Sequence, residues 1–288
     1  MSYRIALIAF GFATLLSFGQ SAFAQEPLVK SGDKVAFLGD SITQGGAGHP
    51  AGYVRRVESG LQANGIKVTV IGAGISGHKS DQMLERLDRD VISKKPNWMT
   101  LSCGVNDVWH GKNGVPLQAY KMNITQIVDK AQAAGIKVMI LTATVIGEDL
   151  KSDNNKKLAD YNAFLRTLAV EKKCVLADLH ADMQAALKAP KYPGLRLTSD
   201  GVHMNPLGDR LMAEGILKTF GLNESQLKKA NDHWYEMPKT CSVNTGLALS
   251  LRQYEQLRDL ADSKGTTMQN LIQQETAKAV ESLLKQSK

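Results

Sequence analysis

From residue 34 to about residue 220, short apolar segments alternate with longer segments in which apolar residues recur at helical spacing. The short segments are rich in Val, Ile and Leu and lack strict polar–apolar alternation, which is typical of strands buried on both faces. We expect strands over residues 34–38, 67–71, 98–102, 137–142 and 174–178. We expect helices over residues 53–63, 82–93, 117–134, 155–171 and 206–219. This alternation predicts an α/β fold in which helices cover both faces of a five-stranded parallel sheet.

A serine stands where the first predicted strand ends, within the sequence Gly39-Asp40-Ser41. Gly39 and Gly45 flank this point, and glycine lets the backbone bend sharply without steric cost. In open parallel sheets, functional groups gather at the carboxyl ends of the strands. The sequence therefore predicts Ser41 as a nucleophile at this edge of the sheet, followed by a glycine-rich turn.

A serine hydroxyl becomes an effective nucleophile only when an oriented base removes its proton. Asp200 and His203 are three residues apart, in a loop that follows the last predicted strand. Asn205 and Pro206 come next and fit the cap and the first residue of a helix. We expect His203 to accept the proton of Ser41, and Asp200 to orient the imidazole.

Amide groups near the same edge can stabilise the oxyanion that develops during acyl transfer. We expect three donors there, namely the backbone N–H groups of Ser41 and Gly77 and the side-chain amide of Asn106. Gly77 follows the second predicted strand, and Asn106 follows the third. Two simpler interpretations stay open, in which Gly77 is only a turn residue and Asn106 only caps the next helix.

These residues resemble the four hallmark blocks of the SGNH, or GDSL, hydrolases, in the family's order, at Gly39-Asp40-Ser41, Gly77, Gly104-Val105-Asn106-Asp107 and Asp200-Gly201-Val202-His203. The resemblance covers roughly residues 33 to 220 and implies a flavodoxin-like three-layer α/β/α sandwich. It implies a serine esterase with Ser41 as nucleophile and with Asp200 and His203 as the rest of the triad. By the same resemblance, Gly77 and Asn106 complete the oxyanion hole. One block departs from the pattern, because Gly72 stands where the family often has an asparagine, which puts a supporting hydrogen bond in doubt.

The family cleaves esters of lipids, thioesters or carbohydrates, and its fold does not select among them. Residues 44–52 and 108–115 flank the nucleophile, and neither loop supplies a long apolar lid for a fatty chain. Trp109 can stack on a sugar ring, with packing as the alternative. We therefore expect hydrolysis of short-chain, acetyl esters of carbohydrates, with Asp40, Asp107 and Trp109 contacting the substrate. The alternatives are a lipid esterase, a lysophospholipase or an acyl thioesterase and, from another class, a non-catalytic glycan-binding or scaffold protein.

Charge and metal-binding patterns argue against several other classes. The net charge is +7, but basic and acidic residues are mixed, so no basic stripe for nucleic acid is expected. His49, His78 and His110 are expected near the mouth of the site, and neither they nor the cysteines have metal-ligand spacing. We expect no metal and no cofactor. Cys103 and Cys174 are expected at opposite strand ends, too far apart for a disulfide.

The N-terminal segment, residues 1–24, has the pattern of a secretory signal peptide. Arg4 precedes an apolar stretch over residues 5–18, and Ala22-Phe23-Ala24 fits a cleavage site. A transmembrane anchor is the alternative, but the stretch is short for a span of about 20 residues. We therefore expect a periplasmic or secreted protein without stable membrane insertion.

The pattern changes after the predicted catalytic domain, residues 25–221. Residues 222–245 are expected to form a linker, and residues 246–288 a mostly helical extension. In this extension a short strand over residues 246–251 precedes a helix over residues 253–264, and a second helix runs to about residue 284. The pattern is similar to ribbon-helix-helix modules, which pair through their strands, and this resemblance implies a homodimer. A helical hairpin packed on the catalytic domain is the alternative.

Overall fold

The computed structural model describes residues 26–286, apart from residues 192–193, 239–240, 242–246 and 248. The predicted signal peptide, residues 1–24, lies outside the described residues. The chain divides into two compact units, Met1–Cys241 and Ser242–Lys288, and each unit is described by itself.

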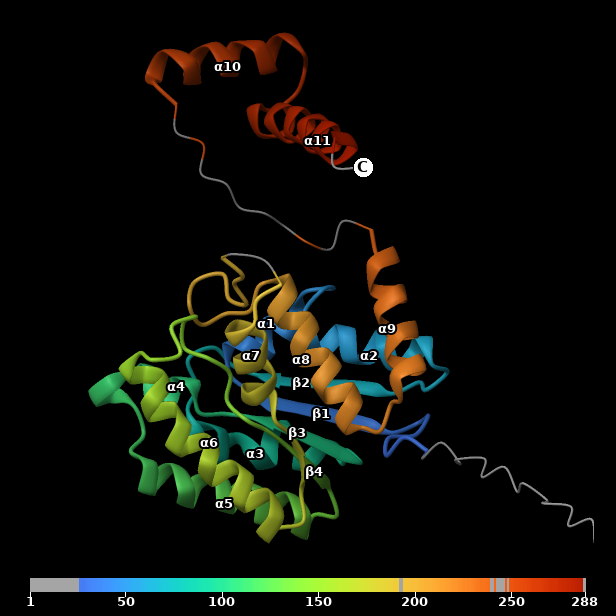
Figure 1. Cartoon of the computed structure of the whole chain (residues 1–288), viewed down its shortest axis with the longest axis vertical. Coiled ribbons are helices and arrows are strands. Elements are labelled where there is room, and N and C mark those ends of the chain that lie inside the picture. Colours follow the sequence, from blue (N-terminus) through green and yellow to red (C-terminus); the bar gives the residue numbers. More distant parts are fainter. Residues whose placement is uncertain (1–25, 192–193, 239–240, 242–246, 248, 287–288) are drawn as a thin grey trace, which may run out of the picture. The chain divides into compact units, whose positions relative to one another are not determined.

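One parallel sheet forms the centre of the first unit, with the strand order β2-β1-β3-β4-β5 (Figure 1). The strands are β1 (Lys34–Gly39), β2 (Thr69–Gly74), β3 (Trp98–Ser102), β4 (Lys137–Leu141) and β5 (Val175–Ala177). Phe37 of β1 pairs with Gly72 on one side and with Thr100 on the other, and β3 pairs with both β1 and β4, so β1 and β3 are inner strands. The predicted α/β fold with a five-stranded parallel sheet is therefore confirmed.

Helices cover both faces of this sheet (Figure 1). One layer contains α1 (Ser41–Gly48), α2 (Tyr53–Ala63), α7 (Leu179–Lys188), α8 (Pro206–Thr219) and α9 (Glu224–Glu236). The other contains α3 (Ser80–Asp90), α4 (Val105–Trp109), α5 (Leu117–Ala133) and α6 (Asp153–Glu171), with the 3₁₀ turns η1 (Ile92–Lys94) and η2 (Gly111–Asn113). The three-layer α/β/α sandwich is thus present, and every helix predicted for it appears within a few residues of its expected bounds.

The glycine-rich segment after Ser41 is a helix, α1, where the sequence predicts a turn. Asp40 caps this helix, because its carboxylate accepts a hydrogen bond from the Ile42 amide at 2.9 Å. Gly46 is required by packing, since a Cβ atom there would lie 2.6 Å from the Tyr53 ring. The low helix propensity of glycine is overridden here by the close contact between α1 and α2.

The expected linker over residues 222–245 is corrected by the structure, because α9 lies within it. The helix buries Leu227, Ala230 and Trp234, and α9 contacts α2. Trp234 also donates a hydrogen bond from Nε1 to the Arg56 carbonyl at 3.1 Å. An amphipathic stripe that is buried against α2 explains why this segment belongs to the catalytic unit, which extends to Cys241.

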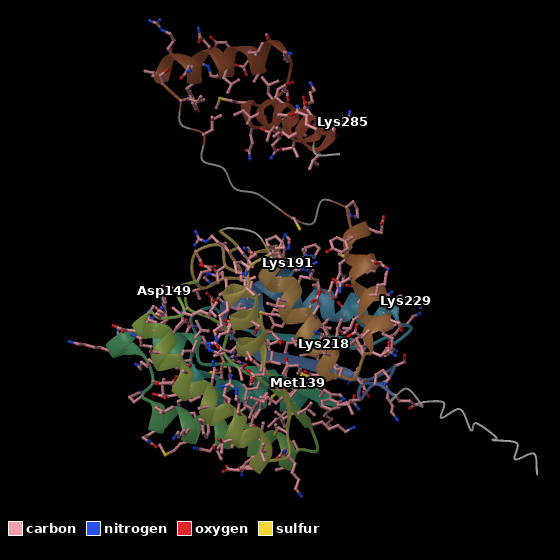
Figure 2. All side chains as sticks on the ribbon, viewed as in Figure 1. Met139, Asp149, Lys191, Lys218, Lys229 and Lys285 are labelled. Carbon is pink, nitrogen blue, oxygen red and sulfur yellow. The ribbon has the colours of Figure 1, made fainter. Side chains whose placement is uncertain are left out.

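The core of this unit is apolar and closely packed around the sheet. Met139 of β4 is fully buried and lies inside the unit, whereas Lys229 extends outward from α9 (Figure 2). Tyr120 and Tyr161 pack with ring centres 4.8 Å apart, and both hydroxyls donate to backbone carbonyls. Cys103 is buried and, like Cys174, a free thiol.

The second unit contains two helices, α10 (Leu251–Ser263) and α11 (Met268–Gln286). Both helices were expected, and the Thr267 hydroxyl caps α11 by accepting from the Asn270 amide at 3.1 Å. The strand expected over residues 246–251 falls partly outside the described residues. Its described members form no strand, since Leu251 begins α10 and Leu247, Leu249 and Ser250 precede that helix. Among the residues described in both units, no helix combines the length and hydropathy needed to cross a membrane.

Candidate active site

The candidate site lies where the strand order of the sheet reverses. The chain runs from β1 to β2 on one side and then crosses to β3 on the other side of β1. Such a switch point leaves a crevice at the carboxyl ends of the two central strands. Ser41 follows β1 at this crevice, and Asn106 follows β3.

Ser41 is the first residue of α1. The first backbone N–H groups of a helix have no acceptor within the helix, and the helix dipole favours negative charge beside them. The local fold therefore places the Ser41 hydroxyl and an available amide at the same point. A serine at this position can present both a nucleophile and an oxyanion donor.

Ser41, His203 and Asp200 form a continuous chain of contacts. The Ser41 Oγ atom lies 2.9 Å from His203 Nε2, and His203 Nδ1 lies 2.6 Å from Asp200 Oδ2. The other oxygen of Asp200 accepts from the backbone amides of Val202 and His203, at 3.0 and 2.8 Å. This geometry matches a serine, its base and the acid that orients the base.

Asp200 stays ionised because its carboxylate accepts several hydrogen bonds. Partial burial raises its pKa, but hydrogen bonds from the His203 ring and from the two backbone amides outweigh burial and lower the pKa to about 2. A carboxylate on Nδ1 selects the imidazole tautomer that leaves Nε2 free to accept a proton. The Nε2 atom of His203 therefore faces the serine as a base.

The loop that carries this acid and base is anchored by Glu148, which sequence analysis missed. The Glu148 carboxylate accepts from the Leu197 amide and from both the amide and hydroxyl of Thr198, at 3.1, 2.9 and 2.6 Å. Ser199 then donates its amide to the His203 carbonyl at 2.8 Å, which closes the turn. Glu148 lies some fifty residues away in sequence, so no local motif connects it with the triad.

The two other predicted oxyanion donors lie at the same cavity as Ser41. Gly77 has a φ of 76°, a left-handed conformation that favours glycine, and a Cβ atom at this position would point into open space. Asn106 lies within α4, and its side-chain amide donates one hydrogen bond to the His78 carbonyl at 3.2 Å. An amide has two N–H groups, so one stays available for a ligand. Gln44 holds the turn before Gly77, because its side-chain oxygen accepts from the Ser76 amide at 2.8 Å.

Arg86 joins the strand ends beneath these donors, and sequence analysis missed it as well. Its guanidinium donates to the carbonyls of Gly39 and Ala73, at 2.7 and 2.8 Å, and to His78 Nδ1 at 3.2 Å. The carboxylate of Asp90 lies 3.0 Å from this guanidinium and balances its positive charge. Gly39 and Ala73 belong to β1 and β2, and the His78 carbonyl orients Asn106. One buried side chain thus ties together the segments that present the nucleophile and the oxyanion donors.

A cavity of about 270 Å³ opens beside the nucleophile. The surface that its walls present is more apolar than polar, and its lining residues are Ser41, Ser76, Gly77, Asn106, Trp109, His110, Asp200, Val202 and His203. Trp109 is half-exposed at the rim, next to His110. The shape and chemistry suit a small acyl group attached to a polar alcohol.

Asp40 and Asp107 do not line this cavity, although both were expected to contact the substrate. Asp107 is fully buried, and its carboxylate accepts from the amide and hydroxyl of Ser80, at 3.0 and 2.6 Å. Burial raises the pKa of Asp107. Burial also raises the pKa of Asp40 to about 6, partly offset by the Ile42 amide. The structure therefore places both carboxyl groups beneath the site, where they hold α1 and the start of α3.

No cluster of metal-ligating side chains is found among the described residues. His49 Nδ1 accepts from the Ala51 amide, and His78 Nδ1 accepts from Arg86. Burial, followed by the nearby charges of Arg86 and Arg89, lowers the pKa of His78. His49 and His78 therefore make local contacts in the scaffold.

Comparison with known proteins gives a family match over residues 37–211, to the GDSL-like Lipase/Acylhydrolase family. An acetylxylan esterase of Geobacillus stearothermophilus is 27% identical over 212 residues, which cover 67% of this chain and 96% of that protein. Esterase TesA of Pseudomonas aeruginosa is 31% identical over 137 residues, covering 47% of this chain and 63% of that one.

Two solved structures are also similar. The crystal structure of the acetyl xylan esterase AlAXEase has 34% identity and a TM-score of 0.60, and covers 64% of this chain and 98% of its own. The acetylxylan esterase Axe2 from Geobacillus stearothermophilus has 26% identity and a TM-score of 0.62, with 68% of this chain and 97% of that chain covered.

Proposed function

Because this chain belongs to the GDSL-like lipase/acylhydrolase family and is a carboxylic ester hydrolase, we propose that Ser41, His203 and Asp200 are its catalytic triad. The observation that carries the proposal is the contact chain of 2.9 Å from Ser41 to His203 and 2.6 Å from His203 to Asp200. These side chains come from two segments 162 residues apart, and they meet beside a cavity of suitable size.

In the proposed mechanism, the Ser41 oxygen attacks the carbonyl carbon of the ester while His203 Nε2 takes the serine proton. The carbonyl oxygen becomes an oxyanion, which accepts hydrogen bonds from the amides of Ser41 and Gly77 and from the Asn106 side chain. The carbon–oxygen bond to the alcohol then breaks, and His203 returns the proton to the leaving alcohol. Water, deprotonated by His203, attacks the acyl-enzyme and releases the acid, which restores the Ser41 hydroxyl.

We infer that the substrates are short-chain, chiefly acetyl, esters of carbohydrates. The cavity of about 270 Å³ suits a small acyl group, and the half-exposed Trp109 ring provides a stacking face for a sugar. Two of the similar proteins are named as acetylxylan esterases. Both features favour a small acyl group on a carbohydrate over a fatty acyl ester.

Release of acetate from a panel of acetylated polysaccharides tests this proposal, with Ser41→Ala as the control. We expect acetate from the wild-type enzyme and none above background from the variant. A series of 4-nitrophenyl esters of increasing acyl length tests the acyl preference separately. Activity that rises toward long chains would favour a lipid esterase or thioesterase instead.

We also propose that the protein is exported through residues 1–24 and that it pairs with a second copy through residues 246–288. The basis for export is the signal-peptide pattern of the sequence. The basis for pairing is the exposed apolar side chains of α10 and α11. Mass analysis of the mature N-terminus tests the first proposal, and light scattering of the full chain tests the second.

A further inference from the structure

A second cavity, of about 340 Å³, lies in the catalytic unit where α2, α8 and α9 meet. Arg56 of α2 lines it, together with Leu207 and Arg210 of α8 and with Asn231 and Tyr235 of α9. None of the proposed catalytic residues lines this cavity. Its size suits a monosaccharide ring or another small ligand.

Arg56 brings a buried positive charge to this cavity, since its residue is only 6% exposed. Its Nε atom donates to the Ala51 carbonyl at 2.7 Å, and its guanidinium carbon lies 5.6 Å from the centre of the Trp234 ring. Among the described residues, its two terminal nitrogens make no hydrogen bond and no carboxylate forms an ion pair with it. Because Arg56 lines the cavity, its terminal nitrogens can donate to an acceptor bound there, and a charged donor gains more from such a bond than a neutral one.

A second guanidinium, that of Arg210, lies on the same cavity. It donates to the Tyr235 hydroxyl, and its Nε atom lies 3.7 Å from Glu214. The other acid near Arg56 is Asp209, whose carboxylate accepts from the Tyr53 amide at 2.9 Å. Burial raises the pKa of Asp209 to about 7, which limits the negative charge that it places near Arg56. The cavity therefore keeps a net positive character.

We propose that this cavity binds a carboxylate carried on a sugar ring, such as a hexuronate unit of an acidic oligosaccharide. Guanidinium groups bind carboxylates through paired, charge-assisted hydrogen bonds. Tyr235 is 70% exposed and Leu207 is also exposed, so both offer apolar faces to a ring. The Asn231 side-chain oxygen accepts no hydrogen bond within the described residues and is available to a sugar hydroxyl. The choice of a sugar acid over other carboxylates rests on the function proposed above.

One loop connects this cavity with the proposed catalytic site. Val202 and His203 line the first cavity, and Pro206 and Leu207 line the second. Pro206 is three positions after His203 in the sequence, so their Cα atoms are at most about 11 Å apart. Because one loop lines both cavities, we expect a short oligosaccharide to place an ester at Ser41 and an acidic unit near Arg56.

Titration of the full-length protein with D-glucuronate, with D-glucose and with inorganic phosphate tests the proposal by calorimetry. Glucuronate is expected to bind at least about ten-fold more tightly than glucose, because only glucuronate carries the carboxylate. Phosphate is expected to displace glucuronate only at higher concentration. Since the titration needs no turnover, it reports on this cavity even if the protein hydrolyses none of the esters tested.

The Arg56→Met variant is expected to lose at least about ten-fold in glucuronate affinity. Arg55→Met is the matched control, because Arg55 lies on the same helix, pairs with Glu58 and does not line the cavity. Its affinity is expected to change less than about two-fold. Arg210→Gln provides a second test if Arg56→Met lowers the melting temperature. Equal binding of glucose and glucuronate, tighter binding of phosphate, or equal losses in Arg55→Met and Arg56→Met would overturn the proposal.

Discussion

The catalytic unit and the C-terminal helix pair use amphipathic helices in opposite ways. In the catalytic unit, α8 buries Met212, Ile216 and other apolar side chains between the sheet and its neighbouring helices. In the second unit, α10 and α11 bury only Ala261 and Leu271 among their described residues, while Leu251 and Leu283 are 74% and 64% exposed. The same helical periodicity thus closes a core in one unit and leaves an open apolar surface in the other. Periodicity predicts a helix, but it does not say what covers the helix.

The described site residues all lie in the first unit, so we expect the catalytic chemistry to reside there, and four changes test the roles of the two units. The largest effect is expected from Asp200→Asn, which should lower kcat/KM about 1,000-fold or more, because an amide no longer selects the correct tautomer of His203. Hydrolysis of 4-nitrophenyl acetate measures the loss. Since the pKa of Asp200 is about 2, wild-type activity should show no loss attributable to this carboxyl above about pH 4. Activity of the variant close to that of the wild type would remove Asp200 from the triad.

Asn106→Ala should have the next largest effect, a fall in kcat of about 100- to 1,000-fold with little change in KM. The expected cause is the loss of one donor to the oxyanion. If Asn106 served only to donate to the His78 carbonyl, its replacement would lower the thermal stability and leave kcat nearly intact. Steady-state kinetics and thermal unfolding of the same preparation separate these two roles.

Asp209→Asn tests the electrostatics of the catalytic unit through stability. The folded-state pKa of about 7 lies above the ordinary 3.8, so the folded protein holds this proton more tightly than the unfolded chain. The carboxyl therefore destabilises the fold increasingly as pH rises from about 4 to 7, and fully above that. Asparagine retains an acceptor for the Tyr53 amide, so the variant should be more stable than wild type by about 1–2 kcal/mol at pH 8 and equal to it at pH 4. Denaturant unfolding at both pH values measures the difference, and a pH-independent difference would contradict the assignment.

Deletion of residues 242–288 should have the smallest effect on catalysis, with kcat/KM within about two-fold of the full chain. The reason is that the described site residues all lie in the first unit. If the exposed leucines pair with a second copy, the full chain should behave as a dimer and the shortened chain as a monomer. Light scattering measures the size of both chains. An unchanged size would exclude pairing through this segment, and a large loss of activity would show that the units cooperate in catalysis.

Much of the fold, and the residues that form the triad, could be predicted from the sequence, because the patterns that reveal them lie within short stretches of the chain. Strands buried on both faces, helix periodicity and the Gly-Asp-Ser strand end are all visible within short windows. The roles of α1 and α9 were not visible, since a glycine-rich helix and a polar helix are stabilised by contacts with α2.

The residues that support the site were also missed, for a related reason. Glu148 and Arg86 act on backbone groups that lie far away in sequence, so their roles depend on the tertiary fold. Asp107 is the converse case, because it was expected to contact the substrate and instead supports the fold. Its place in a motif suggested substrate contact, whereas the folded chain buries it against Ser80.

Covalent labelling with diethyl 4-nitrophenyl phosphate, followed by intact-mass and peptide mass spectrometry, tests directly whether Ser41 is the nucleophile. This reagent transfers its phosphoryl group to an activated serine and releases 4-nitrophenol. We predict one adduct, located on Ser41, and no adduct in Ser41→Ala. We also predict slower labelling in Asp200→Asn, because His203 is then poorly oriented. An adduct on another residue, or wild-type hydrolytic activity in the Ser41→Ala variant, would show that Ser41 is not the nucleophile.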